Sequence, residues 1–156
     1  MSQMRRALLS ILLFACSAAA AGDPEERSIL AVIQKLFDAM ATHDGDAVRA
    51  VSITNGRIFA ARASGIANTS FEEFAVRMSA AKQKYLERMW EPRVQVQGAV
   101  ANVWAEYDFH VDGKLDHCGI DSFSLVKMPE GWRIASLAFT SETTGCAPSP
   151  LGPPRN

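Results

Sequence analysis

The stretch from residue 99 to residue 127, AVANVWAEYDFHVDGKLDHCGIDSFSLVK, decides the fold. Apolar and polar side chains alternate on both sides of Asp112-Gly113, and alternation with a period of two is the pattern of a half-buried β-strand. Asp-Gly favours a two-residue type I′ turn, because both central residues of that turn need a positive φ. The sequence therefore predicts an antiparallel hairpin with strands at 99–111 and 115–127.

Further strands are predicted on both sides of this hairpin. Their ranges are 85–90 and 94–96 before it, and 132–140 after it, with Pro129-Glu130-Gly131 as the last turn. The segment 53–68 is ambiguous, although 57–62 fits a short strand bounded by Gly56 and Gly65.

The residues before these strands have a helical pattern. Asp23-Pro24 followed by Glu26 is a helix start with a capping box. One apolar face follows at helical spacing, formed by Ile29, Val32, Ile33, Leu36, Phe37 and Met40. This helix is expected to end near His43, and shorter helices are expected at 46–51 and at 71–81, the latter capped by Ser70. Helices first and an antiparallel meander afterwards predict an α+β fold, with the helices on one face of a curved sheet.

Composition limits the function classes. The 156 residues fit one domain, and 48% hydrophobic with 21% charged residues excludes a collagen-like, coiled-coil or mostly disordered chain. Lys and Arg number 16 against 17 Asp and Glu, so there is no electrostatic footprint for nucleic acid. The sequence contains no P-loop, G-x-G-x-x-G, G-x-S-x-G or C-x-x-C motif, and no cofactor is expected.

Residues 1–21 have the pattern of a secretory signal peptide. Arg5 and Arg6 precede an apolar run of about ten residues, which is too short for a spanning helix, and Ala19-Ala20-Ala21 fits a cleavage site. Lipidation at Cys16 and an uncleaved anchor are the alternatives. We therefore expect an exported protein, periplasmic or extracellular, with no transmembrane span in the mature chain.

Cleavage would change the charge and the cysteine count. Removing Arg5 and Arg6 leaves 14 basic against 17 acidic residues, and the cysteines left are Cys118 and Cys146. In an oxidising compartment they are a plausible disulfide, and the alternative is one buried and one exposed free thiol. The domain is then expected at 22–146, followed by a Pro-rich, disordered tail at 147–156.

The hairpin turn predicts which side chains share a face. Counting pairs outward from Asp112-Gly113 without interruption puts an apolar set under the helices, formed by Ala101, Val103, Ala105, Tyr107 and Phe109 with Cys118, Ile120 and Ser122 opposite them. The other face then carries Asp108 opposite His117 and Trp104 opposite Asp121. A bulge in either strand would shift this register.

The polar face suggests one chemical hypothesis. Asp108 would orient His117 as a general base, with Asp121 as a second acid/base group. The alternative, a solvated or dimer-facing polar surface, is the favoured interpretation. A metal site of His110, His117 and a carboxylate is conceivable geometrically but matches no ligand-spacing motif. Trp104, beside Asp121, is the tryptophan that would reach a ligand.

Several motifs together resemble the nuclear transport factor 2-like superfamily, in its SnoaL-like and lumazine-binding-like secreted branches. They are Ala39-Met40 with Gly45-Asp46, the segments 104–109 and 112–114, His117-Cys118-Gly119-Ile120-Asp121-Ser122-Phe123, Gly131-Trp132-Arg133-Ile134, and the closing Gly145-Cys146. The resemblance spans about residues 25–146. The Gly-Trp-Arg-Ile ending is weakly specific, whereas the His-Cys-Gly segment with Gly145-Cys146 is more particular to one secreted-type subgroup.

This resemblance implies a cone-shaped α+β barrel with an apolar cavity between a bent sheet and a long helix, and a homodimer. It transfers no catalytic residue. Tyr107 is expected to reach the cavity, with Ala105, Phe109 and Ile120 as walls. Three functions stay open: binding of a small apolar ligand, an isomerase, dehydratase or hydrolase activity, and a dimeric protein-interaction module.

Overall fold

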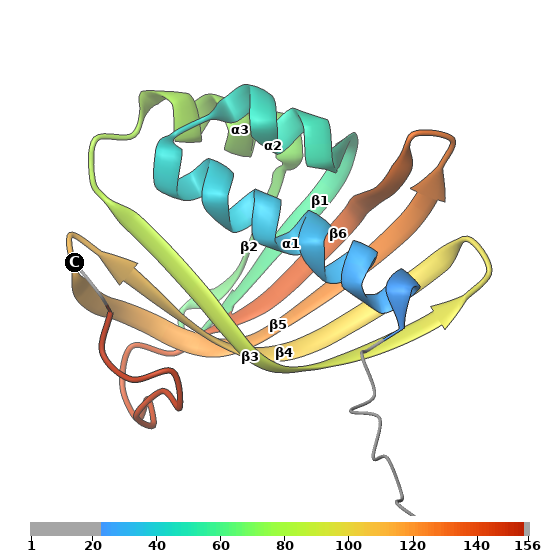
Figure 1. Cartoon of the computed structure of the whole chain (residues 1–156). Helices are drawn as coiled ribbons and strands as arrows, with labels where there is room; N and C mark the ends of the chain where they lie inside the picture. The colour runs from blue at the N-terminus through green and yellow to red at the C-terminus, as the bar shows by residue number, and fades with distance from the viewer. Residues whose placement is uncertain (1–22, 155–156) are drawn as a thin grey trace, which may run out of the picture.

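The computed structural model describes residues 23–154, so the predicted signal peptide lies outside the described residues. Within that range the chain forms three helices and six strands (Figure 1). They are α1 (Pro24–Thr42), α2 (Gly45–Val51), β1 (Ser52–Arg62), β2 (Gly65–Ser70), α3 (Phe71–Ala80), β3 (Tyr85–Gln97), β4 (Val100–Val111), β5 (Lys114–Met128) and β6 (Gly131–Ser141).

The strands form one curved sheet in the order β2-β1-β6-β5-β4-β3. All neighbours are antiparallel except β1 and β6, which run parallel. The helices lie on the concave side of this sheet, as expected for the α+β fold (Figure 1). No helix within the described range is long and apolar enough to cross a membrane.

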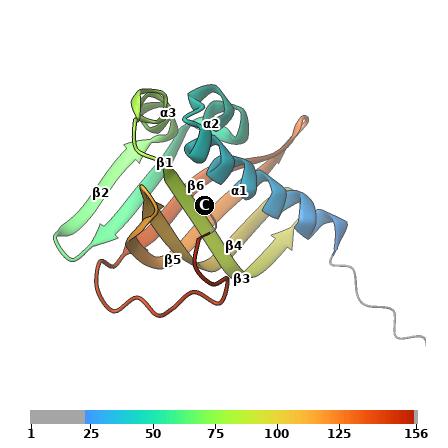
Figure 2. The ribbon, with the colours of Figure 1, turned by 60° about the vertical axis from the view of Figure 1, so that its left-hand side comes forward.

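The ambiguous segment 53–68 forms most of the β1–β2 hairpin, which lies at one side of the sheet (Figure 2). The two short strands predicted at 85–90 and 94–96 are one strand, β3. Its pairing with β4 shifts between Trp90 and Arg93, where Glu91 has a φ of 49°. The shift explains why the alternating pattern is interrupted there.

α1 begins and ends where it was predicted, and its N-terminal cap is a single hydrogen bond to Asp23 rather than the expected capping box with Glu26. The Asp23 carboxylate accepts a hydrogen bond from the backbone N–H of Glu25, and the helix ends at His43 in a left-handed conformation with a φ of 58°. The buried face of α1 packs on the sheet, where the Phe37 and Phe123 ring centroids are 6.2 Å apart. The predicted capping box of α3 is present, because the side chains of Ser70 and Glu73 bond each other's backbone N–H groups.

β5 has a bulge at Asp116, close to its start. From His117 onward, the residues of β5 therefore point to the opposite face from the one predicted. Val111 pairs with Lys114 and His110 with Leu115, but Phe109 pairs with His117, so Asp116 is the extra residue. The uninterrupted register predicted from the turn is therefore wrong beyond His110. Asp108 lies opposite Cys118 rather than His117, and Trp104 lies opposite Ser122 rather than Asp121. A slip of one residue turns each side chain to the other face.

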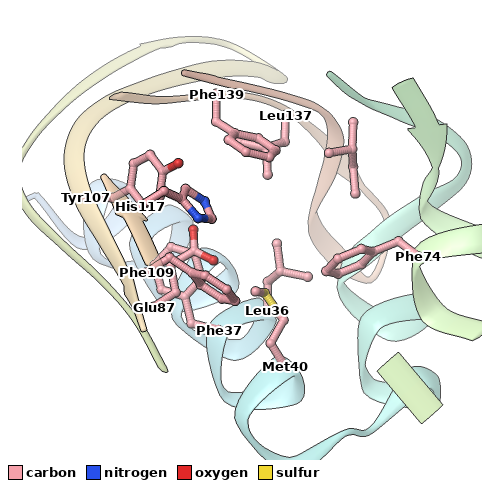
Figure 3. A pocket seen from close by; sticks show the side chains of 11 residues that line it. Leu36, Phe37, Met40, Phe74, Glu87, Tyr107, Phe109, His117, Leu137 and Phe139 are labelled. Carbon is pink, nitrogen blue, oxygen red and sulfur yellow. The ribbon is translucent and has the colours of Figure 1, made fainter. Parts of the chain in front are cut away.

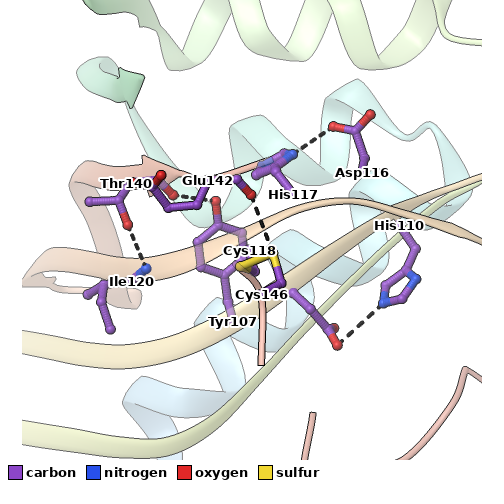
Figure 4. The surroundings of a disulfide bond; sticks show 10 residues. Tyr107, His110, Asp116, His117, Cys118, Ile120, Thr140, Glu142 and Cys146 are labelled. Carbon is purple, nitrogen blue, oxygen red and sulfur yellow. Dashed lines mark hydrogen bonds and ion pairs between the residues drawn. A yellow bond between two sulfur atoms is a disulfide. The ribbon is translucent and has the colours of Figure 1, made fainter. Parts of the chain in front are cut away.

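A disulfide joins Cys118 and Cys146, as the sequence suggested, with their Cα atoms 5.9 Å apart (Figure 4). Backbone hydrogen bonds in both directions tie Cys118 to Glu142, just beyond the end of β6. The segment 147–154, predicted to be disordered, follows the outer side of the sheet in this structure (Figures 1 and 2). The Arg88 guanidinium donates a hydrogen bond to the Gly152 carbonyl at 2.8 Å.

Candidate functional site

The bulge moves His117 to the inner face of the sheet, where it completes a row of three side chains. Glu87 on β3 pairs with Phe109 on β4, which pairs with His117 on β5. Paired residues share a face of the sheet, so all three point toward the helices. The next inward positions on β5 are Gly119 and Asp121, and Asp121 is 1% exposed.

These side chains border a cavity of about 110 Å³ between the sheet and α1 (Figure 3). Its lining is mostly aromatic and aliphatic, from Leu36, Phe37, Met40, Ile58, Phe74, Glu87, Tyr107, Phe109, His117, Leu137 and Phe139. The charge-bearing side chains among them are Glu87 on β3 and His117 on β5, and Figure 3 shows both pointing into the cavity. The cavity can therefore hold an apolar ligand and offer it two polar groups.

His117 is oriented by the residue before it. Its Nδ1 lies 2.7 Å from a carboxylate oxygen of Asp116 (Figure 4). A carboxylate can only accept, so Nδ1 carries the hydrogen and the neutral ring keeps a lone pair on Nε2. The imidazole packs among aromatic rings, with centroid distances of 5.0 Å to Phe109 and 6.0 Å to Phe139. Asp116 and His117 thus form a dyad that can act as a hydrogen-bond acceptor or a general base.

Glu87 and Asp121 are a pair of carboxyl groups in contact. The Glu87 carboxyl is the hydrogen-bond partner of buried Asp121, and no other N–H or O–H of the described residues donates to the Asp121 oxygens. Two carboxyl oxygens can bond only through a shared proton. Burial and the Asp121 charge raise the pKa of Glu87 well above its usual range. Burial raises the pKa of Asp121 to about 7, although the hydrogen bond from Glu87 acts in the opposite direction. The Glu87–Asp121 pair therefore holds a proton more tightly than two separate carboxyl groups would.

Tyr107 lines the cavity as expected, but its hydroxyl is already used. It donates a hydrogen bond to the Thr140 carbonyl at 2.7 Å. Burial raises the pKa of Tyr107, and the charges of Asp121 and Glu87 add to the effect. Its neighbour across the strand pair is Gly119, where an added Cβ would lie 2.3 Å from the Thr140 oxygen. Gly119 thus allows β5 and β6 to approach closely beside the tyrosine.

A family model described as "Putative lumazine-binding" matches residues 24–140. The chain belongs to this family. No curated protein sequence matches the chain significantly.

Solved structures show the same fold as this lumazine-binding-type chain. The Kfla4162 protein from Kribbella flavida has a TM-score of 0.65 at 16% identity, over 75% of this chain and 90% of that one. A nuclear transport factor 2-like superfamily protein from Salmonella enterica serovar Typhimurium has a TM-score of 0.62 at 15% identity, over 78% of this chain and 94% of that one. A protein of the same type from Cytophaga hutchinsonii has a TM-score of 0.64 at 13% identity, over 75% and 98%. The predicted superfamily and fold class are confirmed.

In this member of the lumazine-binding-type family, the structure separates the predicted catalytic candidates. His117 and Asp121 lie on the inner face, contrary to the predicted register, whereas Asp108 lies on the outer side. Asp108 forms paired hydrogen bonds with Arg88, and His110 Nε2 lies 3.3 Å from it. Burial alone would raise the pKa of Asp108, but the hydrogen bonds from Arg88 hold it below its usual value.

The predicted ligand contacts are also divided between the faces. Phe109 and Tyr107 line the cavity, but Trp104 is 52% exposed on the outer face and Ile120 is not among the lining residues. Residues 23–154 contain no cluster of three or more metal-ligating side chains, so the conceivable site at His110 and His117 does not form there.

Asp116 and Glu87 are the site residues that the sequence did not single out. Glu87 lies in a strand whose apolar and polar residues alternate, and this alternation could have predicted that its side chain faces inward. Asp116 gave no such signal, because no glycine or proline marks the bulge.

Proposed function

We propose that this protein binds a small, largely apolar, ring-containing ligand in the cavity between α1 and the sheet. The observation that carries the proposal is a mostly apolar cavity with one imidazole and one carboxyl group pointing into it. The rings of Phe37, Phe109 and Phe139 can pack against a flat ligand edge-to-face or offset. Nε2 of His117 would accept a hydrogen bond from the ligand, and the Glu87 oxygen that is not engaged with Asp121 would accept a second.

Binding is testable with N-phenylnaphthylamine, a neutral apolar dye that fluoresces in apolar surroundings. We expect saturable fluorescence with the wild type. Leu137→Phe places a larger side chain in the cavity, so the dye should bind roughly tenfold more weakly or not at all. Trp104→Ala on the outer face is the control and should leave the affinity unchanged. The opposite pattern, loss in Trp104→Ala and none in Leu137→Phe, would place the dye outside the cavity.

A second candidate function is proton transfer on such a ligand. The specific support is the joint presence of a carboxylate-oriented imidazole and a carboxyl pair that shares a proton, which together can supply the base and the acid of general acid–base catalysis. In this scheme Nε2 of His117 removes a proton from a carbon next to a carbonyl, and the proton shared by Glu87 and Asp121 is drawn toward the carbonyl oxygen.

Solvent deuterium exchange tests the second candidate. A panel of cyclic ketones and enones in deuterium oxide would be followed by proton NMR. We expect exchange above the buffer rate for at least one compound, lost in His117→Gln and reduced in Asp116→Asn. Exchange at the buffer rate across the panel would leave ligand binding as the function and contradict the catalytic scheme.

We also propose that the chain is exported and that the mature protein is a homodimer. The disulfide supports an oxidising compartment. The outer sheet face exposes Trp104 and Val100, each 52% accessible, which is a suitable contact for a second copy. Sedimentation velocity of the purified protein should give a dimer. A strict monomer at all concentrations would contradict the proposed homodimer.

A further inference from the structure

The cavity opens into a wider groove with a different chemical character. The groove has a volume of about 670 Å³ and shares six apolar or aromatic-ring positions with the cavity, namely Met40, Ile58, Phe74, Phe109, His117 and Phe139. Its own polar lining comes from Arg62, Asn68, Thr69, Arg77, Gln83 and Asp116. An occupant that extends out of the cavity therefore passes from an apolar to a polar and charged environment.

Arg62 lies on the inner face of β1 at the end of the strand. Ile58 and Ala60 alternate with exposed neighbours and are buried, so Arg62 continues the same face toward the groove. The positive charge of Arg62 also influences Tyr107 in the cavity wall. Burial is the main cause of the raised pKa of Tyr107, and the positive charge of Arg62 opposes it.

Arg77 reaches the groove from α3. It follows Phe74 by one helical turn, and its guanidinium carbon lies 5.7 Å from the centre of the Phe74 ring. Phe74 lines both the cavity and the groove. The guanidinium is thus held at the point where the apolar wall gives way to the groove.

The charge of these two arginines is not compensated inside the fold. Within residues 23–154 no ion pair joins Arg62 or Arg77 to a carboxylate. The carboxylate in the groove lining, Asp116, is engaged by Nδ1 of His117. The groove lining therefore contains two positively charged side chains, Arg62 and Arg77, and one carboxylate, Asp116, which is already hydrogen-bonded to His117.

The inner end of the cavity cannot accept a negative charge. Its walls are apolar, and the carboxyl pair there already needs a proton to be stable. A ligand with an anionic group would have to keep that group at the mouth. We propose that the ligand is an amphipathic acid, whose ring enters the cavity while its carboxylate is held at the groove by Arg62 and Arg77. This inference rests on the proposed ligand-binding function and names the class of ligand.

Calorimetric titration of matched acids and amides tests the ligand class. Phenylacetate, phenylpropanoate and phenylbutanoate would each be compared with the corresponding amide, which has the same shape and no charge. At least one acid should bind the wild type roughly tenfold more tightly than its amide, and this preference should weaken with added salt. In the double variant Arg62→Gln, Arg77→Gln the acid should bind no better than its amide.

Two controls separate the possible failures. Arg93→Gln removes the same charge from the outer face and should keep the preference for the acid. The double variant Arg62→Lys, Arg77→Lys should keep part of the preference for the acid, since Lys also carries a positive charge. Equal binding of acid and amide by the wild type, or a preference that survives in the double variant, would overturn the amphipathic-acid inference alone. Failure of both acids and amides to bind would overturn the proposed ligand binding as well.

Discussion

Asp121→Asn is expected to make the protein more stable than the wild type above neutral pH. In the folded protein burial raises the pKa of Asp121 from an ordinary 3.8 to about 7. The folded state therefore keeps a proton that the unfolded chain releases between about pH 4 and pH 7. The state that binds more protons is favoured at low pH, so this group makes the wild type lose stability as the pH rises.

The asparagine removes this loss because it does not titrate, and its carbonyl can still accept a hydrogen bond from Glu87. The stability of the variant relative to the wild type should rise by up to about 4 kcal/mol between about pH 4 and pH 8, the equivalent of the pKa shift.

Urea unfolding at a series of pH values measures this difference. Asp38→Asn is the matched control, because Asp38 is an exposed aspartate on α1, and its stability relative to the wild type should not follow the pH. A relative stability of Asp121→Asn that is constant with pH, or that falls, would show that Asp121 is ionised in the folded protein across the whole range.

Removing the disulfide is expected to lower the free energy of unfolding by roughly 3–4 kcal/mol, according to the chain-entropy model for a loop of this size. The bond spans 28 positions and joins β5 to the segment after β6. Cys118 directly follows His117, so the bond also holds the strand next to the bulge. The double variant Cys118→Ser, Cys146→Ser measures the effect without leaving an unpaired thiol.

Reduction gives an independent measurement of the same quantity. Dithiothreitol should lower the wild-type urea midpoint to that of the double variant and should not change the double variant itself. A wild-type midpoint that is the same with and without dithiothreitol would contradict a stabilising role for the bond, provided that mass spectrometry confirms its reduction.

The fold was predictable to the extent that its signals are local. The Asp23 cap and the helical spacing of α1, the Ser70–Glu73 capping box and the Asp112-Gly113 turn each depend on residues close in sequence. The inner face of β4 followed from simple alternation, and Ala101, Val103 and Ala105 are buried as expected.

The site was less predictable because it depends on one inserted residue. The bulge at Asp116 has no local signature, and the contacts that hold the strand there come from Glu142 and Cys146, far along the chain. An uninterrupted count from the turn therefore placed His117 and Asp121 outside. The predicted partner of His117, Asp108, is wrong: the carboxylate at its Nδ1 belongs to Asp116.

The most direct test of the account is the imidazole NMR spectrum of ¹⁵N-labelled protein during titration with N-phenylnaphthylamine. The chain has three histidines, and among them His117 lines the cavity, whereas His43 bonds the Gln83 carbonyl and His110 lies beside Asp108 on the outer side. We expect the His117 signals, with hydrogen on Nδ1 in the free protein, to shift saturably with the dye while those of His110 stay in place. Saturable dye binding that moves His110 and leaves His117 unchanged would contradict the account.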